Sequence, residues 1–309
     1  MKIKSGNQFV RNHKTNESID AETLGLAYGF LGVLIFSLTL PSTRLAVAEL
    51  DSTFVGLGRA VVASILAALL LKVTRQPIPL RRHLSSLVVV ALGVIVGFPL
   101  LSAWAMRSLP ASHGAIIVGI LPLATAIVGA LRTGERPSTK FWLCSGIGST
   151  VVVGFAVITG GGRLQITDLA LLGAVIAAAV GYAEGGRLSR ELGGWQVICW
   201  ALVLSAIPLT VPVAIAIAQH GLHASLQAWL GFGYVSVFSM FLGFFAWYHG
   251  LAIGGVVRVS QMQLLQPFLT IFASVLFLQE QMTTPTIITA LVVFATVAVG
   301  KKAPIYSLQ

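Results

Sequence analysis

Charged residues are scarce in this chain. They make up 10% of its 309 residues, whereas hydrophobic residues make up 56%. Since a soluble domain carries about 25% charged residues, this composition excludes a soluble globular protein. The alternating polar and apolar segments of roughly ten residues that build a membrane β-barrel are also missing. We therefore predict an all-α membrane protein with several spans.

Residues for catalysis and metal binding are equally sparse. The two cysteines, Cys144 and Cys199, lie inside apolar runs, so we expect them to pack without forming a disulfide. His220 and His223 lack a third metal ligand, and neither a Gly-x-Ser-x-Gly nor a His-Glu-x-x-His motif occurs. We expect no catalytic residue, no metal and no cofactor. An intramembrane enzyme and a membrane scaffold are the alternatives from other functional classes.

Ten apolar segments are long enough to cross a membrane as helices, which takes about 20 residues each. The connections between them are short, so neighbouring helices are expected to pack antiparallel in one bundle. The segments lie near residues 24–48, 53–73, 85–107, 111–132, 138–159, 167–188, 195–218, 226–250, 256–279 and 283–300.

The net charge of +10 comes from basic residues dispersed among the connections, so it does not indicate nucleic-acid binding. It is typical of the excess of lysine and arginine on the cytoplasmic side of membrane proteins. If the N-terminus is cytoplasmic, Arg107 and Arg163 are the only basic residues of the connections on the outer side, where Glu49 and Asp51 also lie. With ten spans, both termini are then cytoplasmic.

A motif on the fourth apolar segment recurs on the ninth. Pro122 is followed thirteen residues later by Glu135, and Pro267 by Glu280, so the copies are displaced by 145 residues. We predict two homologous halves of five helices, which enter the membrane from opposite sides, as in secondary transporters with inverted repeats. The predicted parts are a cytoplasmic tail (1–22), a first repeat (23–160), a second repeat (161–302) after the hinge Gly160–Gly162, and a cytoplasmic tail (303–309).

The two copies of the motif resemble the fourth and ninth helices of the EamA-type branch of the drug/metabolite transporter superfamily. The resemblance runs from Leu109 through Pro122 to Arg136, and from Gln266 to Glu280. Within the superfamily, the chain most resembles the YddG-type exporters of aromatic amino acids. This implies a central cavity surrounded by helices one, three, four, six, eight and nine. Helices two and seven would be peripheral, and five and ten would lie at the repeat interface.

The same resemblance implies a multi-pass secondary transporter of the bacterial inner membrane that exports small amphipathic metabolites by alternating access. Aromatic or other apolar amino acids are the expected substrates, and cationic drugs or other metabolites are the alternative. We expect a small-molecule substrate and membrane lipid as partners, no nucleic acid, and a monomer.

Glu184 is expected to pair with Arg187 at the cytoplasmic end. No acidic residue lies in the middle of a span, so we expect a facilitator, or a carrier whose coupling needs no mid-membrane carboxylate.

Helix-breaking and polar residues in the first and third segments are candidates for the cavity. Pro41 lacks an N–H, so the carbonyl of Ser37 loses its helical donor, and such breaks are common at transporter sites. Kinks without substrate contact are the alternative. Arg44 either binds a substrate carboxylate or reaches the outer headgroups. The candidates here are Thr39, Pro41, Ser42, Arg44, Pro99 and Ser102.

A polar stripe follows one face of the ninth segment, where Gln263, Gln266 and Thr270 are spaced three and four residues apart. Glutamine both donates and accepts hydrogen bonds, which suits the ammonium and carboxylate groups of an amino acid. Hydrogen bonding between helices is the alternative. Alanine at either glutamine is expected to impair transport with little effect on expression.

Aromatic residues form a second stripe, on the eighth segment. Phe241, Phe244 and Tyr248 lie at helical spacing and are candidates for stacking on an aromatic substrate. The aromatic belt at the membrane interface is the alternative. Tyr182 on the sixth segment is a further cavity candidate. His113 on the fourth segment faces either the cavity or its own backbone network.

Overall fold

The structure, a computed structural model, confirms the all-α class. Apart from a two-residue antiparallel pairing of β1 (Arg136–Pro137) with β2 (Ile305–Tyr306), every element in the described part of the chain is a helix. Glu135 of the first motif and the hinge Gly160–Gly162 lie outside that part. The structure describes residues 6–133, 136–159, 165–301 and 305–306.

Eight helical stretches among the described residues are long and apolar enough to cross a membrane, as expected of a multi-pass membrane protein. Two further helices, α8 (Thr139–Thr159) and α15 (Thr284–Lys301), contain the shorter apolar stretches Trp142–Ile158 and Thr284–Thr296. The eight stretches are Thr23–Val47, Phe54–Val73, Arg81–Ala105, Ala111–Arg132, Ile166–Leu192, Gly194–His220, Leu226–Gly254 and Val256–Leu278.

Only two of these stretches are single α-helices, α9 (Ile166–Leu192) and α10 (Gly194–His220). In the others the helix breaks or changes its geometry: η1, η2 and η3 are π-helical, and η4 is a 3₁₀-helix. Three stretches consist of two elements each: α1 (Gly6–Ser37) with α2 (Thr39–Val47), η1 (Phe54–Gly58) with α3 (Arg59–Val73), and α6 (Ala111–Val118) with α7 (Leu121–Thr133). Three consist of three elements each: α4 (Arg81–Val90), η2 (Ala91–Gly97) and α5 (Phe98–Ala105); α11 (Leu226–Tyr234), η3 (Val235–Leu242) and α12 (Gly243–Gly254); and α13 (Val256–Val259), η4 (Ser260–Leu265) and α14 (Gln266–Leu278). Because α1 begins at Gly6, helix extends through most of the tail predicted at 1–22.

Prolines account for several of the breaks. Pro99 and Pro267 occupy the first turns of α5 and α14, directly after η2 and η4. Proline cannot donate a backbone hydrogen bond, so regular α geometry is interrupted before it. The gap between α6 and α7 lies just before Pro122, the counterpart of Pro267. The fourth and ninth of the ten predicted segments therefore break at corresponding positions of the repeated motif.

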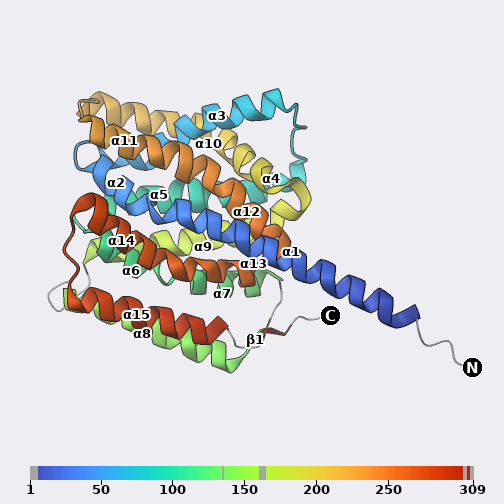
Figure 1. The fold of residues 1–309 in the computed structure, drawn as a ribbon. Coiled ribbons are helices and arrows are strands. Elements are labelled where there is room, and N and C mark those ends of the chain that lie inside the picture. The colour runs from blue at the N-terminus through green and yellow to red at the C-terminus, as the bar shows by residue number, and fades with distance from the viewer. Residues whose placement is uncertain (1–5, 134–135, 160–164, 302–304, 307–309) are drawn as a thin grey trace, which may run out of the picture.

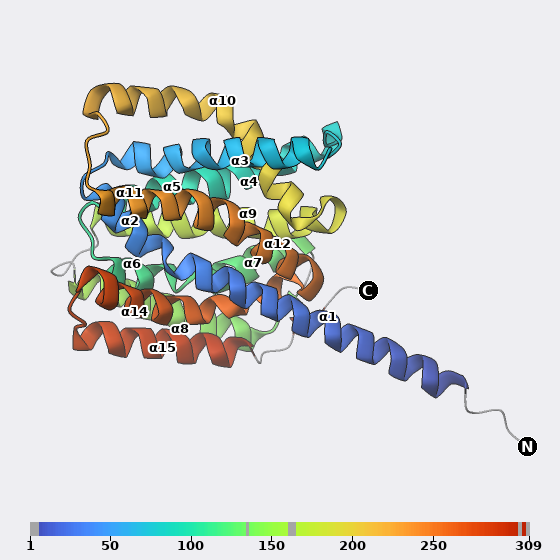
Figure 2. The same cartoon turned by 45° about the horizontal axis from the view of Figure 1, so that its top comes forward.

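Helix packing repeats along the chain. Numbered by the ten predicted segments, of which α8 is the fifth and α15 the tenth, the first contacts the eighth (α1 with α12) and the sixth contacts the third (α9 with η2 and α5). The second packs on the seventh (α3 on α10), and the fifth packs on the tenth (α8 on α15). Figures 1 and 2 show α3 and α10 along one edge of the bundle and α8 and α15 along the opposite edge. The start of α1 and the end of α15 lie toward the same end of the bundle.

Glycines allow two of these helix pairs to approach closely. A Cβ atom added at Gly25 in α1 would lie 2.6 Å from the Cα of Gly254 in α12. One added at Gly93 in η2 would lie 2.5 Å from the carbonyl oxygen of Ala177 in α9. Both contacts are with backbone atoms, so glycine is the residue that fits at these two positions.

A carboxylate at one end of the bundle joins two connections. Glu49, just after α2, accepts hydrogen bonds from the backbone N–H of Ser225 at 2.7 Å and from its hydroxyl at 2.6 Å. Ser225 is also the N-cap of α11, because its hydroxyl accepts a hydrogen bond from the N–H of Ala228. The two bonds from Ser225, the hydroxyl bond first, lower the pKa of Glu49. Ionised Glu49 therefore ties the α2–η1 connection to the start of α11.

We expect this contact to make stability depend on pH in the acid range. Since the pKa of Glu49 is lowered by folding, its contribution is complete above the ordinary carboxyl pKa and is lost as pH falls through the lowered value. The effect should be small because the carboxylate is exposed to solvent. Thermal unfolding in detergent should show a weaker loss of stability below about pH 4 in Glu49→Gln than in the wild type. Identical pH dependence of the two proteins would contradict the assignment.

Candidate functional site

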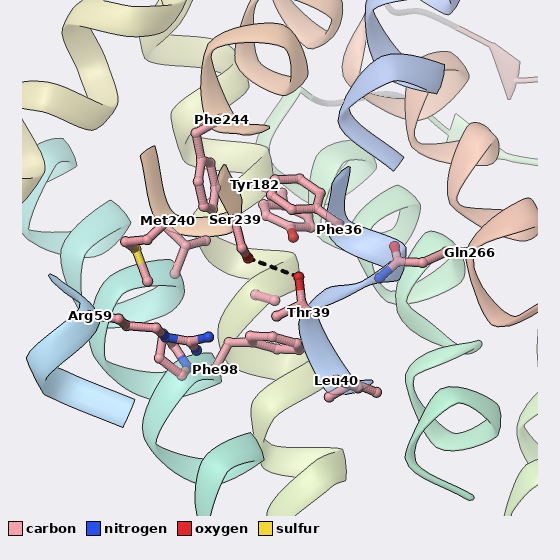
Figure 3. A pocket seen from close by; sticks show the side chains of 13 residues that line it. Phe36, Thr39, Leu40, Arg59, Phe98, Tyr182, Ser239, Met240, Phe244 and Gln266 are labelled. Atoms are coloured by element: carbon pink, nitrogen blue, oxygen red, sulfur yellow. Dashed lines mark hydrogen bonds between the residues drawn. The ribbon is translucent and has the colours of Figure 1, made fainter. Parts of the chain in front are cut away.

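A small cavity lies in the middle of the bundle, where the broken helices meet (Figure 3). Its volume is about 20 Å³, which holds roughly one water molecule. A larger molecule can enter only if the surrounding helices or side chains move. The residues lining it are Phe36, Thr39, Leu40, Arg59, Val94, Phe98, Pro99, Ala178, Tyr182, Ser239, Met240, Phe244 and Gln266.

Most of the lining residues lie where a helix departs from regular α geometry. Thr39 starts α2 directly after the break in the first span, and Arg59 directly follows the π-helical η1. Phe98 directly follows η2, Ser239 lies within η3, and Gln266 directly follows the 3₁₀ segment η4. Helix irregularities of this kind are frequent at functional sites, and they are places where a helix can bend. The cavity is thus bordered by the most deformable parts of the spans.

One wall of the cavity is aromatic. The ring centroids of Phe36 and Phe244 are 5.1 Å apart, and each of these rings lies near Tyr182, at 6.3 and 6.0 Å. Trp247 packs behind them, 5.3 Å from the ring of Tyr182. Figure 3 shows Phe36, Tyr182 and Phe244 gathered on one side of the cavity. These rings come from α1, α9 and α12 and offer an apolar surface for a flat or branched group.

Polar groups of the first span complete the site. The hydroxyls of Thr39 and Ser239 are hydrogen-bonded at 2.8 Å across the cavity wall. The Ser37 carbonyl, deprived of its helical donor by Pro41, accepts a hydrogen bond from the Thr270 hydroxyl at 2.8 Å. A hydroxyl from another helix thus satisfies the carbonyl that Pro41 leaves free. Thr270 therefore links α14 to the break between α1 and α2.

Arg59 is the one charged residue among those lining the cavity. Its side chain is 1% exposed, and its Nε and Nη1 atoms have no hydrogen-bond partner within the described residues. Arg59 was not among the predicted site residues, and the second span was expected to be peripheral. The available signal was a charged residue inside a span, which usually faces a cavity or a partner. The structure brings the second span into the cavity through Arg59, while no residue of the fourth span lines it.

The structure brings five of the predicted site residues to the cavity. These are Thr39, Pro99, Tyr182, Phe244 and Gln266. They come from the first, third, sixth, eighth and ninth spans, as the resemblance implies for those helices. The side-chain oxygen of Gln266 is buried without a hydrogen-bond partner in the described structure.

Other predicted residues lie behind the cavity wall. Ser102 donates to the Pro99 carbonyl at 3.2 Å within its own helix. Gln263 is 1% exposed, and neither polar atom of its side chain has a partner among the described residues. Pro41 and Ser42 lie in α2, and Thr270 bonds the first span; none of the three lines the cavity.

Only one of the three residues in the aromatic stripe of the eighth predicted segment lines the cavity. Phe244 lines the cavity, whereas Phe241 packs edge-on against Phe245, with centroids 4.7 Å apart. Tyr248 is fully buried and donates a hydrogen bond to the Gly181 carbonyl at 3.1 Å. Phe241 and Tyr248 therefore pack within the bundle, and neither lines the cavity.

His113 pairs with a carboxylate from another helix. Its Nε2 atom lies 2.8 Å from a carboxylate oxygen of Asp168, which is 1% exposed. Asp168 also accepts a hydrogen bond from the N–H of Gln165 and caps the start of α9. His113 thus connects the fourth span to the start of the sixth and lies away from the cavity.

A second, larger cavity opens at the end of the bundle that carries Glu280. Its volume is about 600 Å³. The Glu280 carboxylate accepts hydrogen bonds from the N–H groups of Ala111 and Ser112, at 2.8 and 2.9 Å, and so caps α6. Arg44 donates a hydrogen bond to the Met106 carbonyl. The lining residues are Arg44, Leu45, Val47, Ala48, Arg107, Leu278 and Glu280.

A cluster of ion pairs lies at the opposite end of the bundle. Glu184, 3% exposed, pairs with Arg132 at 3.0 Å and with Arg187 at 2.7 Å. The predicted pairing of Glu184 with Arg187 is confirmed, and Arg132 is an additional partner. Arg187 also donates to the Ser86 hydroxyl at 2.9 Å. The cluster holds together the third, fourth and sixth spans.

The fold and the sequence are similar to those of known proteins. A crystal structure 15% identical in sequence superposes with a TM-score of 0.65, over 90% of this chain and 98% of that one, which shows a shared fold. The uncharacterized transporter YdeK of Bacillus subtilis (strain 168) is 46% identical over 281 residues, covering 91% of this chain and 98% of the relative. A probable terminal-alkyne amino-acid exporter of Streptantibioticus cattleyicolor is 24% identical over 258 residues, covering 81% of this chain and 84% of the relative.

The model of the EamA-like transporter family matches the chain twice, at residues 23–159 and 165–299. Together the two matches cover nearly all of the apolar helices. The first relative, at 46% identity over almost its whole length, also bears the name of a transporter. The chain therefore belongs to the EamA-like transporter family and is not an enzyme.

Proposed function

We propose that this transporter exports small amphipathic metabolites, chiefly aromatic or other apolar amino acids, across the bacterial inner membrane. The observation that carries the proposal is the central cavity, where an aromatic wall faces buried polar groups at the breaks of several helices. A transporter site needs both, since the apolar surface selects the side chain and the polar groups orient the ends of the molecule. The relative named as a probable amino-acid exporter supports this substrate class.

The proposed architecture is ten spans in two inverted halves, 23–160 and 161–302, with α8 and α15 as the fifth and tenth spans. The contact of Glu280 with Ala111 supports the inversion, since it places the end of the ninth span beside the start of the fourth. The proposed orientation has both termini in the cytoplasm, as the distribution of lysine and arginine indicates. We propose a monomer in contact with lipid, since each half packs on the other.

Alternating access is the proposed mechanism. The cavity of about 600 Å³ opens at the Glu280 end, the outer end in this orientation, while the Glu184 cluster closes the cytoplasmic end. Substrate enters from the cytoplasm after the Glu184 cluster separates, and leaves through the outer cavity. The π-helical segments around the central cavity supply places where the spans can bend. No acidic residue lines the central cavity, which supports a facilitator or a coupling without a carboxylate at the site.

Counterflow in liposomes tests the proposed function. Vesicles with the purified protein are loaded with one unlabelled compound and placed in a solution of the same compound in labelled form, without a pH gradient. The compounds are phenylalanine, leucine, sugars, nucleotides and cationic drugs. We expect uptake for the aromatic and apolar amino acids and none in protein-free vesicles. Absence of counterflow for every amino acid would overturn amino-acid export. Uptake of cationic drugs alone would favour the alternative substrate class, and a strict need for a pH gradient would overturn the facilitator.

Gln266→Ala is expected to lower the counterflow rate about tenfold, the effect of losing roughly one hydrogen bond to substrate. The side-chain oxygen of Gln266 has no internal partner among the described residues, so its removal should leave expression and thermal stability close to wild type. Gln227→Ala, on the exposed side of α11, is the control and should transport normally. Equal rates for both variants would remove Gln266 from the proposed site.

A further inference from the structure

Arg59 places a positive charge in the middle of the bundle, with no counter-charge paired to it among the described residues. It begins α3, directly after η1, and its side chain is 1% exposed. Two of its guanidinium nitrogens, Nε and Nη1, have no hydrogen-bond partner within the described part of the chain. No ion pair to Arg59 occurs among the described residues. A buried charge of this kind is costly in a membrane and usually marks a functional site.

The guanidinium points into the central cavity. Figure 3 shows it on the side where Phe98 and Met240 lie, with the Thr39–Ser239 hydrogen bond farther along the wall. None of the residues lining the cavity is acidic. The site therefore has one uncompensated positive charge, an aromatic wall and several neutral polar groups.

This combination defines the ligand that fits it. The planar guanidinium binds carboxylates through two parallel hydrogen bonds, which satisfy donors that are otherwise buried and unpaired. Once the surrounding helices or side chains have moved to admit it, an apolar or aromatic group can pack on the rings of Phe36, Tyr182 and Phe244. A cationic drug would instead meet a like charge, which is unfavourable in a buried site.

We propose that Arg59 is the anion-recognition group of the central cavity and that the substrates are carboxylates bearing an aromatic or apolar group. The proposal rests on the proposed transport function and names the substrate class of the same cavity. Gln266, whose side-chain oxygen is unpartnered, is placed to accept a hydrogen bond from the ammonium group of an amino acid. Arg59 selects the carboxylate, and the rings select the side group.

Thermal unfolding of the purified full-length protein in detergent tests this without any transport. The probes are L-phenylalanine, 3-phenylpropionate and L-phenylalaninamide, which share the phenyl ring but differ in carboxylate and ammonium groups. We expect the first two to raise the melting temperature of the wild type, and the amide, which lacks the carboxylate, to leave it unchanged. Stabilisation by the amide as strong as by phenylalanine would overturn the role of Arg59. A wild type stabilised by none of the three would overturn the substrate class.

Variants at Arg59 provide the second measurement. Arg59→Gln is expected to weaken binding of L-phenylalanine about thirtyfold or more, the effect of removing one partner of a buried charged pair. Arg59→Lys keeps the charge but not the planar fork, so it should retain part of the affinity. Arg190→Gln, an exposed arginine at the end of α9, is the control. If Arg59→Gln fails to fold, the probe series on the wild type still decides the proposal; if it folds and binds phenylalanine like the wild type, the proposal is overturned.

The two proposals fail in different ways. Binding that depends on Arg59 without counterflow in liposomes would overturn transport of that compound and leave the anion site standing. Counterflow of phenylalanine and its amide at equal rates would overturn the anion site and leave transport standing.

Discussion

Leucine in place of Gly25 is expected to abolish the yield of folded, monodisperse protein. A Cβ at this position would lie 2.6 Å from the Cα and 2.7 Å from the N atom of Gly254, both in the backbone of α12. Backbone atoms cannot rotate away as a flexible side chain can, so α1 and α12 would have to separate along their contact. Overpacking in a tight core costs about 1–3 kcal/mol and more where nothing can yield. Gly93→Leu should have the same effect on the packing of η2 against α9, since its Cβ would meet the Ala177 carbonyl at 2.5 Å.

Gly233→Leu is the matched control for these glycine variants. Gly233 also lies in a membrane-spanning helix, α11, but a Cβ there has no atom within 4 Å. Its yield after detergent extraction should equal that of the wild type. Size-exclusion chromatography of the three variants provides the comparison. A monodisperse Gly25→Leu protein with normal counterflow would show that α1 and α12 do not need this close contact.

Removing both arginine partners of Glu184 should cause the second largest effect. In Arg132→Ala/Arg187→Ala, the carboxylate of Glu184, which is 3% exposed with the arginines in place, loses both of its ion pairs. The arginines are partly exposed, so the ion pairs themselves contribute little; the cost comes from the buried charge that is left behind. An uncompensated charge of this kind costs about 3 kcal/mol, which corresponds to a melting temperature lowered by about 5 °C or more.

Adding Glu184→Gln to the double variant should restore most of the lost stability, because the glutamine carries no charge. Arg190→Ala, which removes an exposed arginine from the same helix, should leave the melting temperature close to that of the wild type. The measurement is thermal unfolding of each purified protein in detergent at neutral pH. A double variant as stable as the wild type, or a triple variant less stable than the double, would show that the charge of Glu184 is not what the arginines compensate.

Site residues could be predicted from sequence only where a proline, or a stripe of polar or aromatic residues within a single helix, marks them. Pro41 identified the break in the first span, and the missing N–H of proline alone implied the free carbonyl of Ser37. The partner of that carbonyl, Thr270, lies on a helix more than 200 residues away. Gln266 and Phe244 were found as members of polar and aromatic stripes, but the same stripes included Gln263 and Tyr248, which do not line the cavity.

Arg59 and His113 show why the rest of the site could not be predicted. A charged residue in a span indicates an interior position, yet nothing in the second span by itself indicates that Arg59 reaches the cavity. The pairing of His113 with Asp168 joins the fourth span to the start of the sixth across 55 residues of chain. Both cases depend on the rotation of each helix about its axis, which is set by contacts with other helices.

The sequence by itself determined the membrane class, the approximate limits of the spans and the repeated motif, because hydropathy, segment length and proline spacing are local properties of the chain. Only the tertiary structure decided which side chains share the central cavity. In spans that are apolar on nearly every face, periodicity does not mark the inward side, and close backbone contacts such as Gly25 with Gly254 fix how the helices are turned. That packing leaves Arg59 without an ion-pair partner among the described residues and places it in the same cavity as the aromatic wall.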